Sequence, residues 1–293
     1  MFIHYFLTVL TAVFVALSAL GKKYSNARSM REKMLNIGVF SAIVALCMWA
    51  AFFFSGEKIG LTVVLYGAVF AVNFVICNYA LYAAMEYGSL SKTNLVNALS
   101  LVIPTSAGII FWQEKYNPWL FFSALALMTV SLLLIVLNKR EARAAHGGKW
   151  LLFNSIAFLT NGLSSVIQKS EQTAMGGAGV FSMTALSFSF VAIFALAVYI
   201  PAACAKRSFG SDFLSLKNNK KSLLFNAAGV GIVNLSVTYL STRVTGAFLY
   251  PCVLGGSVIV AAVFSAVFFK EKLSLKAAVG IAAGVAAIVL FSL

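Results

Sequence analysis

Long apolar blocks, separated by short stretches of charged and turn-forming residues, account for almost the whole chain. Each block is close to the roughly 20 apolar residues that an α-helix needs to cross a bilayer core about 30 Å thick. Cutting the chain at charges and turn residues predicts ten membrane-spanning helices, at 2–21, 34–54, 61–83, 93–112, 118–137, 150–168, 180–203, 222–240, 246–269 and 275–292. The pattern therefore predicts an all-α membrane protein without a separate soluble domain.

The composition favours lipid over water as the main solvent. Apolar residues make up 61% of the 293 positions and charged residues only 10%, whereas soluble domains carry about 25% charged residues. The net charge of +14 could suggest a nucleic-acid partner, but the lysines and arginines lie almost entirely between the apolar blocks. We therefore expect membrane lipids and no nucleic acid as the partners of this charge. The four cysteines lie in apolar blocks without metal-ligand spacing, so no disulfide is expected.

The basic residues are distributed unequally between the two sides of the predicted bundle. When the connecting segments are assigned to alternate sides, only Lys58, Lys115, Lys169 and Arg243 fall on the side of the termini. Short connections rich in lysine and arginine stay in the cytoplasm, so this distribution places both termini outside the cell. The first helix is expected to be retained, because basic residues follow it instead of preceding it as they do in a signal peptide.

The two halves of the chain show the charge pattern of an inverted repeat. The connection after the first helix is rich in basic residues and its counterpart after the sixth has one, whereas the next pair of connections shows the reverse. Because five is odd, two five-helix halves enter the membrane in opposite senses, which requires this inversion. A shift of 157 residues also superimposes Glu114 on Glu271, each followed by a lysine. The expected units are a first repeat at 1–138, a basic linker at 139–149 and a second repeat at 150–293.

Two blocks of sequence carry a family resemblance. In the first half, residues 80–104 lead into the sequence FWQEK at 111–115. In the second half, residues 246–251 lead into FKEK at 269–272 and then into the glycine-containing stretch 280–284. Each block combines a proline-containing helix, a turn with glutamate and lysine, and a closing helix. In this the chain resembles the drug/metabolite transporter superfamily, and specifically its ten-helix EamA-like branch of two five-helix repeats.

The resemblance implies transport of small metabolites by alternating access. It covers helices three to five and eight to ten, whereas the connection at 21–33 is longer and more basic than the family pattern. Members of the family have cytoplasmic termini, and the basic residues of this chain indicate the opposite orientation. Both orientations are kept open at this point.

Polar residues within the apolar blocks are the candidates for a substrate site near the middle of the membrane. Many of them recur at spacings of three, four or seven, so that they share helix faces. The candidates are Asn73, Asn78 and Tyr82 on the third helix; Asn94, Asn97 and Ser100 on the fourth; Asn161, in one stripe with Asn154, Ser165 and Gln168, on the sixth; Asn234, Thr238 and Tyr239 on the eighth; and Tyr250 and Ser257 on the ninth. Such stripes can line a polar cavity between the halves, or they can supply hydrogen bonds that hold the helices together.

Charged candidates are few. Glu86 and Arg243 could bind substrate charges at the rim of a cavity, or they could simply face water at helix ends. Glu114 and Glu271 are expected to be structural, either capping helix amides or pairing with the adjacent lysine. Since no acidic residue falls at the middle of a predicted helix, the pattern favours facilitated diffusion or exchange over proton coupling.

The tenth helix contains a small-residue face. Gly280 and Gly284 form a GxxxG pattern, which allows two helix backbones to approach closely. The partner is either the fifth helix of the same chain or a second protomer, with internal packing favoured. The protein is therefore expected to be a monomer or a homodimer.

The predicted function is transport of a small polar metabolite across the cell membrane. Asparagine, serine, threonine and tyrosine suit amino acids, amines, sugars or nucleosides about equally. An enzyme is disfavoured, because the only histidines are His4 and His146 and no metalloprotease motif is present. No cofactor or metal is expected. A lipid or polyprenyl-carrier flippase is the alternative, which a cavity open sideways to lipid would favour, and a continuous pore would indicate a channel.

Overall fold

A computed structural model of the chain describes residues 2–23, 29–87, 90–115, 117–137, 147–268 and 275–292. These residues form helices and no strand. The helices are α1 (Phe2–Lys23), α2 (Met30–Ser55), α3 (Leu61–Tyr87), α4 (Leu90–Leu99), α5 (Val102–Trp112), α6 (Pro118–Leu137), α7 (Gly147–Ala174), α8 (Val180–Lys206), α9 (Phe209–Asn218), α10 (Lys220–Leu240), α11 (Gly246–Tyr250), the π-helical η1 (Pro251–Gly255), α12 (Gly256–Phe268) and α13 (Leu275–Ser292). Most of the predicted linker and the predicted turn at Glu271 lie outside the described residues.

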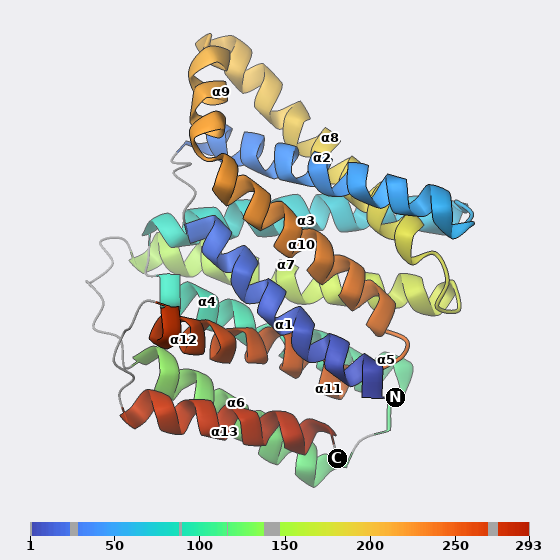
Figure 1. Ribbon diagram of the computed structural model, residues 1–293, viewed down its shortest axis with the longest axis vertical. Coiled ribbons are helices and arrows are strands. Elements are labelled where there is room, and N and C mark those ends of the chain that lie inside the picture. The colour runs from blue at the N-terminus through green and yellow to red at the C-terminus, as the bar shows by residue number, and fades with distance from the viewer. Residues whose placement is uncertain are drawn as a thin grey trace.

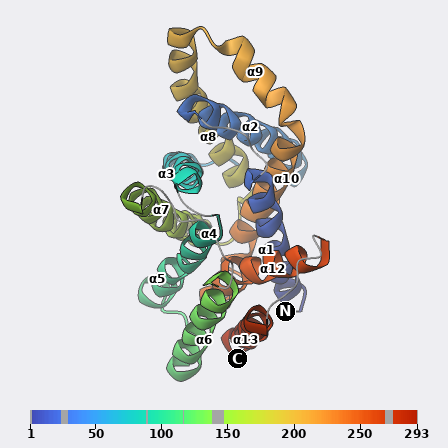
Figure 2. The same ribbon diagram turned by 90° about the vertical axis from the view of Figure 1, so that its left-hand side faces the viewer.

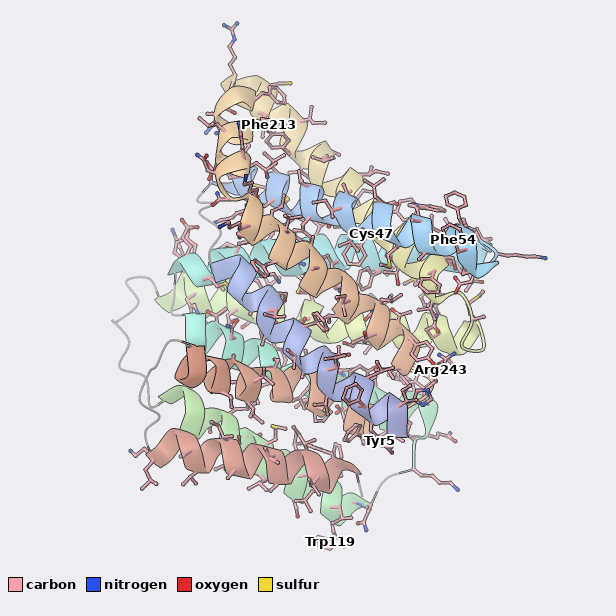
Figure 3. The ribbon with its side chains drawn as sticks, in the orientation of Figure 1. Tyr5, Cys47, Phe54, Trp119, Phe213 and Arg243 are labelled. Atoms are coloured by element: carbon pink, nitrogen blue, oxygen red, sulfur yellow. The ribbon has the colours of Figure 1, made fainter. Side chains whose placement is uncertain are left out.

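The long helices lie side by side with their axes in roughly one direction (Figure 1). Within the described residues, seven helical stretches are long and apolar enough to cross a membrane, and shorter apolar helices within α1, α6 and α13 accompany them. Large apolar side chains such as Phe54 and Trp119 extend from the outer surface, 92% and 85% exposed (Figure 3). Apolar side chains on the outside are stable in lipid and costly in water. The protein is therefore an all-α, multi-pass membrane protein.

The helices pair in a regular way. Seen along the helix axes, α2 with α8 and α6 with α13 occupy the two ends of an elongated cross-section (Figure 2). Between them, α3 and α7 lie along one side, and α1 and α10 lie along the other. Further contacts join α7 to α4 and α5, α1 to α12, α3 to α8, and α10 to α2.

Two of the predicted helices are interrupted, and they are the fourth of each half. The first breaks between α4 and α5, where Ser100 and Leu101 form a turn with backbone bonds of 3.2 Å to the carbonyls of Asn97 and Ala98. The second changes at Pro251 from α11 to the π-helical η1 and then to α12. Proline lacks an amide hydrogen, so it leaves a carbonyl of the preceding turn without its helical partner. Both interruptions lie within the bundle, where irregular backbone requires other partners.

The two ends of the bundle differ in charge. We call the end that holds the start of α1 and the end of α13 the terminal end, and the opposite one the basic end (Figure 1). Described basic residues at the basic end are Lys22, Lys23, Arg31, Lys33, Lys92, Lys149, Lys206, Arg207, Lys217, Lys220, Lys221 and Lys276. The terminal end holds Lys58, Lys115, Lys169 and Arg243. The folded chain therefore keeps the charge asymmetry that the sequence indicated.

Several predicted boundaries are wrong. α2 begins at Met30 instead of residue 34, and α3 continues to Tyr87 instead of ending at residue 83. The sixth helix was predicted to end at residue 168, but α7 continues to Ala174 and carries Lys169 within it. α7 can continue past Lys169 because the ammonium group of this residue pairs with a buried carboxylate, which is described below. The connection after α8 was predicted as a loop, but it contains the helix α9. In its first turn Asp212 is buried, 2.8 Å from Nε of Arg31 and 2.9 Å from Oγ of Ser208.

The small-residue face of α13 packs inside the chain, as the sequence favoured. Ser131 on α6 donates a hydrogen bond of 2.5 Å to the carbonyl of Gly280. A Cβ atom at Gly284 would lie 2.5 Å from the Ser131 hydroxyl and would also overlap Ile259 on α12. The two glycines therefore allow α13 to approach α6 and α12 closely.

Substituting Gly284 with alanine should destabilise the protein by about 1–3 kcal/mol, the usual cost of overpacking a close helix contact. Thermal unfolding in detergent, followed by tryptophan fluorescence, measures the effect. Gly148→Ala is the matched control, because a Cβ atom there meets nothing within 4 Å. The control should unfold at the wild-type temperature or slightly above it. Equal unfolding temperatures for the two variants would contradict the close packing of α13.

Candidate functional site

α7 carries a stripe of polar residues at the centre of the bundle. Asn154, Asn161, Ser165 and Gln168 follow one another at spacings of seven, four and three, so they lie on one face of the helix. We call these four residues the α7 polar stripe. α7 packs against α3, α4, α5 and α10. The stripe therefore lies where helices from both halves of the chain meet.

The middle of the stripe contacts the interruption between α4 and α5. Nδ2 of Asn161 donates to Oγ of Ser100 at 2.7 Å and to the carbonyl of Asn97 at 3.4 Å. Ser100 is completely buried, and its hydroxyl donates to the same carbonyl at 2.6 Å. Oδ1 of Asn97 is buried, and no described residue donates a hydrogen bond to it. Three predicted site residues, Asn97, Ser100 and Asn161, are thus brought together at a break in a helix.

The next turn of the stripe reaches α10. Gln168 is buried, and its Nε2 donates to Oγ1 of Thr238 at 3.0 Å and to Oδ1 of Asn234 at 3.1 Å. Asn234 in turn donates to the carbonyl of Val230 one turn earlier at 2.8 Å. The structure therefore joins the predicted residues of the eighth helix to the stripe predicted on the sixth.

The remaining members of the stripe are Ser165, which contacts α11, and Asn154, whose side chain has no described hydrogen-bond partner. The hydroxyl of Tyr250, itself fully buried, lies 3.5 Å from the carbonyl of Ser165. Asn154 is buried, and neither its amide nitrogen nor its oxygen has a hydrogen-bond partner in the described residues. Buried polar atoms in proteins are nearly always hydrogen-bonded, so unpartnered ones are expected where water or a ligand binds.

Two asparagines of α3 lie apart from the stripe. Asn73 donates to the carbonyl of Thr160 and to Oγ of Ser164, both at 2.8 Å, on a neighbouring face of α7. Asn78 is buried and donates to the carbonyl of Phe74 on its own helix at 3.0 Å, while its Oδ1 has no hydrogen-bond partner. Asn73 therefore connects α3 to α7 beside the stripe, whereas the hydrogen bond of Asn78 stays within α3.

The structure does not bring four further candidates to the stripe. Tyr82 lies in the apolar cluster formed mainly by α2, α3 and α8. Ser257 donates to the carbonyl of Leu254 on the same helix run at 2.7 Å. Asn94 is half-buried on α4. Glu86 is exposed at the basic end, 2.5 Å from Nζ of Lys33.

A pocket of about 400 Å³ lies at the terminal end between α1, α8 and α10. Its lining residues are Leu7, Glu57, Gly177, Val180, Phe181, Leu235, Ser236, Tyr239, Leu240 and Arg243. Arg243, labelled in Figure 3, lies over the ring of Tyr239 at 3.9 Å and donates to the carbonyls of Tyr239 at 2.6 Å and Gly177 at 3.3 Å. The predicted residues Tyr239 and Arg243 therefore belong to this pocket, on a different face of α10 from Asn234.

The terminal end also holds a buried ion pair that sequence reasoning missed. Lys169 on α7 pairs with Glu114, which follows α5, and their side chains are only 5% and 14% exposed. The second carboxylate oxygen of Glu114 accepts the amide hydrogen of Gly246 at the start of α11, at 2.8 Å. Nζ of Lys169 lies 5.1 Å from the centre of the Trp112 ring. Glu114 is thus structural, as expected, but its partner is not the adjacent lysine.

Comparison with known proteins supports the fold alone. No protein-family model matches the chain, and no curated protein matches its sequence. Solved structures do match. One, described only as a crystal structure of a protein, aligns with a TM-score of 0.71 over 98% of this chain and 94% of its own, at 12% sequence identity. The arrangement of helices therefore also occurs in an experimentally determined protein.

Proposed function

We propose that the protein is a ten-span transporter of the drug/metabolite transporter type, built from two inverted five-helix repeats in the cell membrane. It carries a small polar metabolite of the amino acid, amine, sugar or nucleoside class by alternating access, as a facilitator or an exchanger. α4 with α5, and α11 with η1 and α12, each count as one span, and α9 lies at the basic end. The repeats then comprise α1 to α6 and α7 to α13.

The observation that carries this proposal is the pairing of the helices. Each span has a counterpart at the same place in the other repeat, such as α7 for α1 and α10 for α3. If every span is replaced by its counterpart, the contact of α1 with α10 becomes the observed contact of α7 with α3. The contact of α1 with α12 becomes that of α7 with α4 and α5. The contact of α3 with α8 becomes that of α10 with α2, and the pairs α2 with α8 and α6 with α13 map onto themselves. An exchange that preserves the contacts is what a two-fold relation between inverted repeats requires.

The interrupted helices support a site between the repeats. Transporters of this architecture bind substrates where helices break near the middle of the membrane, because free backbone groups become available there. The α4–α5 break carries the carbonyl of Asn97 and contacts the α7 polar stripe through Asn161. Unpartnered buried oxygens at Asn97 and Asn154 are available to a polar ligand.

The charge asymmetry supports an orientation. The basic end faces the cytoplasm and the terminal end faces outward, because short basic connections resist transfer across the membrane. The pocket beside Arg243 would then open to the outside, and the buried pair of Lys169 and Glu114 would lie at the same end. This orientation is opposite to the one that the family resemblance implies.

Ligand binding can be tested by thermal unfolding of the purified protein in the presence of metabolite pools. A ligand at about 100 times its dissociation constant stabilises the folded state by about 2.7 kcal/mol. Replacing Gln168 with leucine removes the bonds to Asn234 and Thr238 and should weaken the response to the active pool about tenfold. Ser257→Ala is the control, because the Ser257 hydroxyl donates to the carbonyl of Leu254 within its own helix run. An unchanged response in Gln168→Leu would place the site elsewhere, and a response to lipid or polyprenyl phosphates alone would indicate a flippase.

A further inference from the structure

Glu171 is a buried carboxylate without a positive partner. It lies on α7, one turn before the helix ends at Ala174, and its side chain is completely buried. Oε2 accepts a hydrogen bond of 2.8 Å from Nε2 of Gln172. Oε1 is buried and has no hydrogen-bond partner among the residues that the structure describes. Gln172 is also completely buried, and its own Oε1 is unpartnered.

Every other acidic residue that the structure describes has a cation or backbone amides beside its carboxylate. The pairs are Asp212 with Arg31, Glu114 with Lys169, Glu86 with Lys33, Glu57 with the amides of Phe181 and Ser182, and Glu32 with the amide of Ser29. In the described part of the chain, the carboxylate of Glu171 accepts one hydrogen bond, from the neutral side-chain amide of Gln172. Within the described residues, every carboxylate except that of Glu171 is therefore either paired with a cation or hydrogen-bonded to backbone amides.

The charged groups near Glu171 do not compensate a negative charge. Lys169 on the same helix is engaged by Glu114, and Arg243 is engaged by the ring and carbonyl of Tyr239 and by the carbonyl of Gly177. Glu57, from the connection between α2 and α3, is itself negative. An ionised carboxylate buried without a counter-charge costs several kcal/mol, and such groups take up a proton instead.

Glu171 lies directly behind the wall of the pocket. Oε1 of Glu171 is 3.7 Å from the position that a Cβ atom would take at Gly179, the residue before α8. The next two residues, Val180 and Phe181, line the pocket, and so does Glu57, which accepts the amides of Phe181 at 3.3 Å and Ser182 at 2.8 Å. Glu57 therefore lines the pocket and holds the start of α8, and Glu171 lies against the same stretch of chain at Gly179.

We propose that Glu171 is a proton-binding site loaded from this pocket, and that the proton is the ion exchanged for the metabolite. A hydronium ion in the pocket gives its proton to the carboxylate of Glu57 and leaves as water, and Glu57 then passes a proton to Oε1 of Glu171 and returns to its starting state. Gln172 keeps Oε2 as the acceptor of its amide, so Oε1 is the oxygen that receives the proton. Exchange for a metabolite rests on the proposed transport function, whereas proton binding does not.

This inference corrects an expectation from the sequence. Glu171 follows the predicted end of the sixth helix at residue 168, and proton coupling was disfavoured because no acid fell at the middle of a predicted helix. In the structure, Glu171 lies near the end of α7 and is nevertheless completely buried. Gln172 donates to the carboxylate and Gly179 lies beside it, so the carboxylate is buried even though the helix ends three residues later.

The pH dependence of folding tests proton binding without any ligand. Above about pH 5 the carboxyl group of the unfolded chain is ionised, so a folded state that keeps its proton loses stability as the pH rises. Relative to Glu171→Gln, which mimics the neutral acid, the wild-type folding equilibrium constant should fall by up to about tenfold per pH unit. Glu86→Gln is the matched control, because Glu86 is exposed at the basic end and paired with Lys33, and this variant should keep the pH dependence of the wild type. A wild type that runs parallel to Glu171→Gln between about pH 6 and 8 would overturn the proposal.

Infrared spectroscopy tests the same group and its connection to the pocket. At pH 7 wild-type protein should show the carbonyl stretch of a protonated carboxylic acid, and Glu171→Gln should lack it. After a jump to alkaline pH, loss of this band should be at least about tenfold slower in Glu57→Gln, because a positioned proton-transfer group accelerates such steps. An identical band in Glu171→Gln, or an unchanged rate in Glu57→Gln, would refute the site or its relay, respectively.

The two proposals can fail separately. A pH-linked stability and an acid band at Glu171, together with no metabolite uptake into liposomes, would keep the proton site and reject transport. Saturable metabolite uptake that an imposed pH gradient does not alter would keep transport and reject proton exchange.

Discussion

Replacing Lys169 with methionine should destabilise the protein by about 3–5 kcal/mol, because it leaves the buried carboxylate of Glu114 without its counter-charge. Glu114→Gln alone should be similarly harmful, since the ammonium of Lys169 is then unpaired. The double variant should recover most of the lost stability. The glutamine oxygen can still accept the amide of Gly246, and no charge remains buried. Thermal unfolding of the four proteins forms a double-mutant cycle.

The control for this cycle is Lys115→Met. Lys115 is adjacent to Glu114 and was one of the two kinds of partner that the sequence allowed, the other being helix amides, but its side chain is exposed. Its replacement should change the stability by less than about 0.5 kcal/mol. Additive losses in the double variant, or a Lys115 variant as unstable as the Lys169 variant, would contradict the buried pair.

Replacing Asn161 with leucine should reduce transport by at least about tenfold. The substitution removes the donor to Ser100 and to the carbonyl of Asn97 at the α4–α5 break. The Asn97 carbonyl keeps the Ser100 hydroxyl as a donor, but the buried oxygen of Ser100 loses its own donor. Leaving a buried acceptor unsatisfied costs about 1–3 kcal/mol, and 1.4 kcal/mol corresponds to a factor of ten. The rate of uptake into liposomes, at equal amounts of folded protein, measures the effect.

Ser257→Ala is again the appropriate comparison for Asn161→Leu. Both residues were predicted to line the site, but only Asn161 reaches the helix break, while the Ser257 hydroxyl bonds to Leu254. The Ser257 variant should transport at the wild-type rate. If Ser257→Ala were inactive and Asn161→Leu active, the site would lie on α12 and not along α7.

Helices were predictable from the sequence because lipid imposes a simple rule on them. Each backbone polar group in the membrane must bond within its own helix, so apolar runs of spanning length mark the helices almost residue by residue. The predicted starts of the spans at Leu61, Pro118 and Val180 agree with the structure to the residue. The packing of Gly284 followed from the same reasoning, because small residues only help where helices touch.

Contacts between distant segments were not predictable in the same way. Lys169 looked like the end of a helix, and its partner Glu114 lies 55 residues away in sequence. One signal was present, since the polar spacing of Asn161, Ser165 and Gln168 continues to Gln172, which indicates a helix that runs past the lysine. The burial of Glu171 had no such signal, because it depends on the turn at Gly179 and on the start of α8.

The sequence predicted a set of polar candidate residues, and the structure shows which of them lie in contact with one another. Asn97, Ser100 and Asn161 meet at one helix break, and Gln168 meets Asn234 and Thr238. Tyr82 shared the spacing of Asn78 but lies in an apolar cluster. Spacing along one helix defines a face, and only the neighbouring helix decides whether that face is polar.

Uptake from a metabolite mixture is the most direct test of the central claim, which is that the protein transports a metabolite through a site between its two repeats. Liposomes containing the wild-type protein are incubated with a metabolite extract, washed, and analysed by mass spectrometry beside liposomes with Asn161→Leu and liposomes without protein. We expect one or a few small polar metabolites to accumulate saturably with the wild type, faster when the liposomes are preloaded with the same compound. No selective accumulation, or unsaturable entry of all small solutes alike, would contradict a carrier that alternates between the two sides of the membrane.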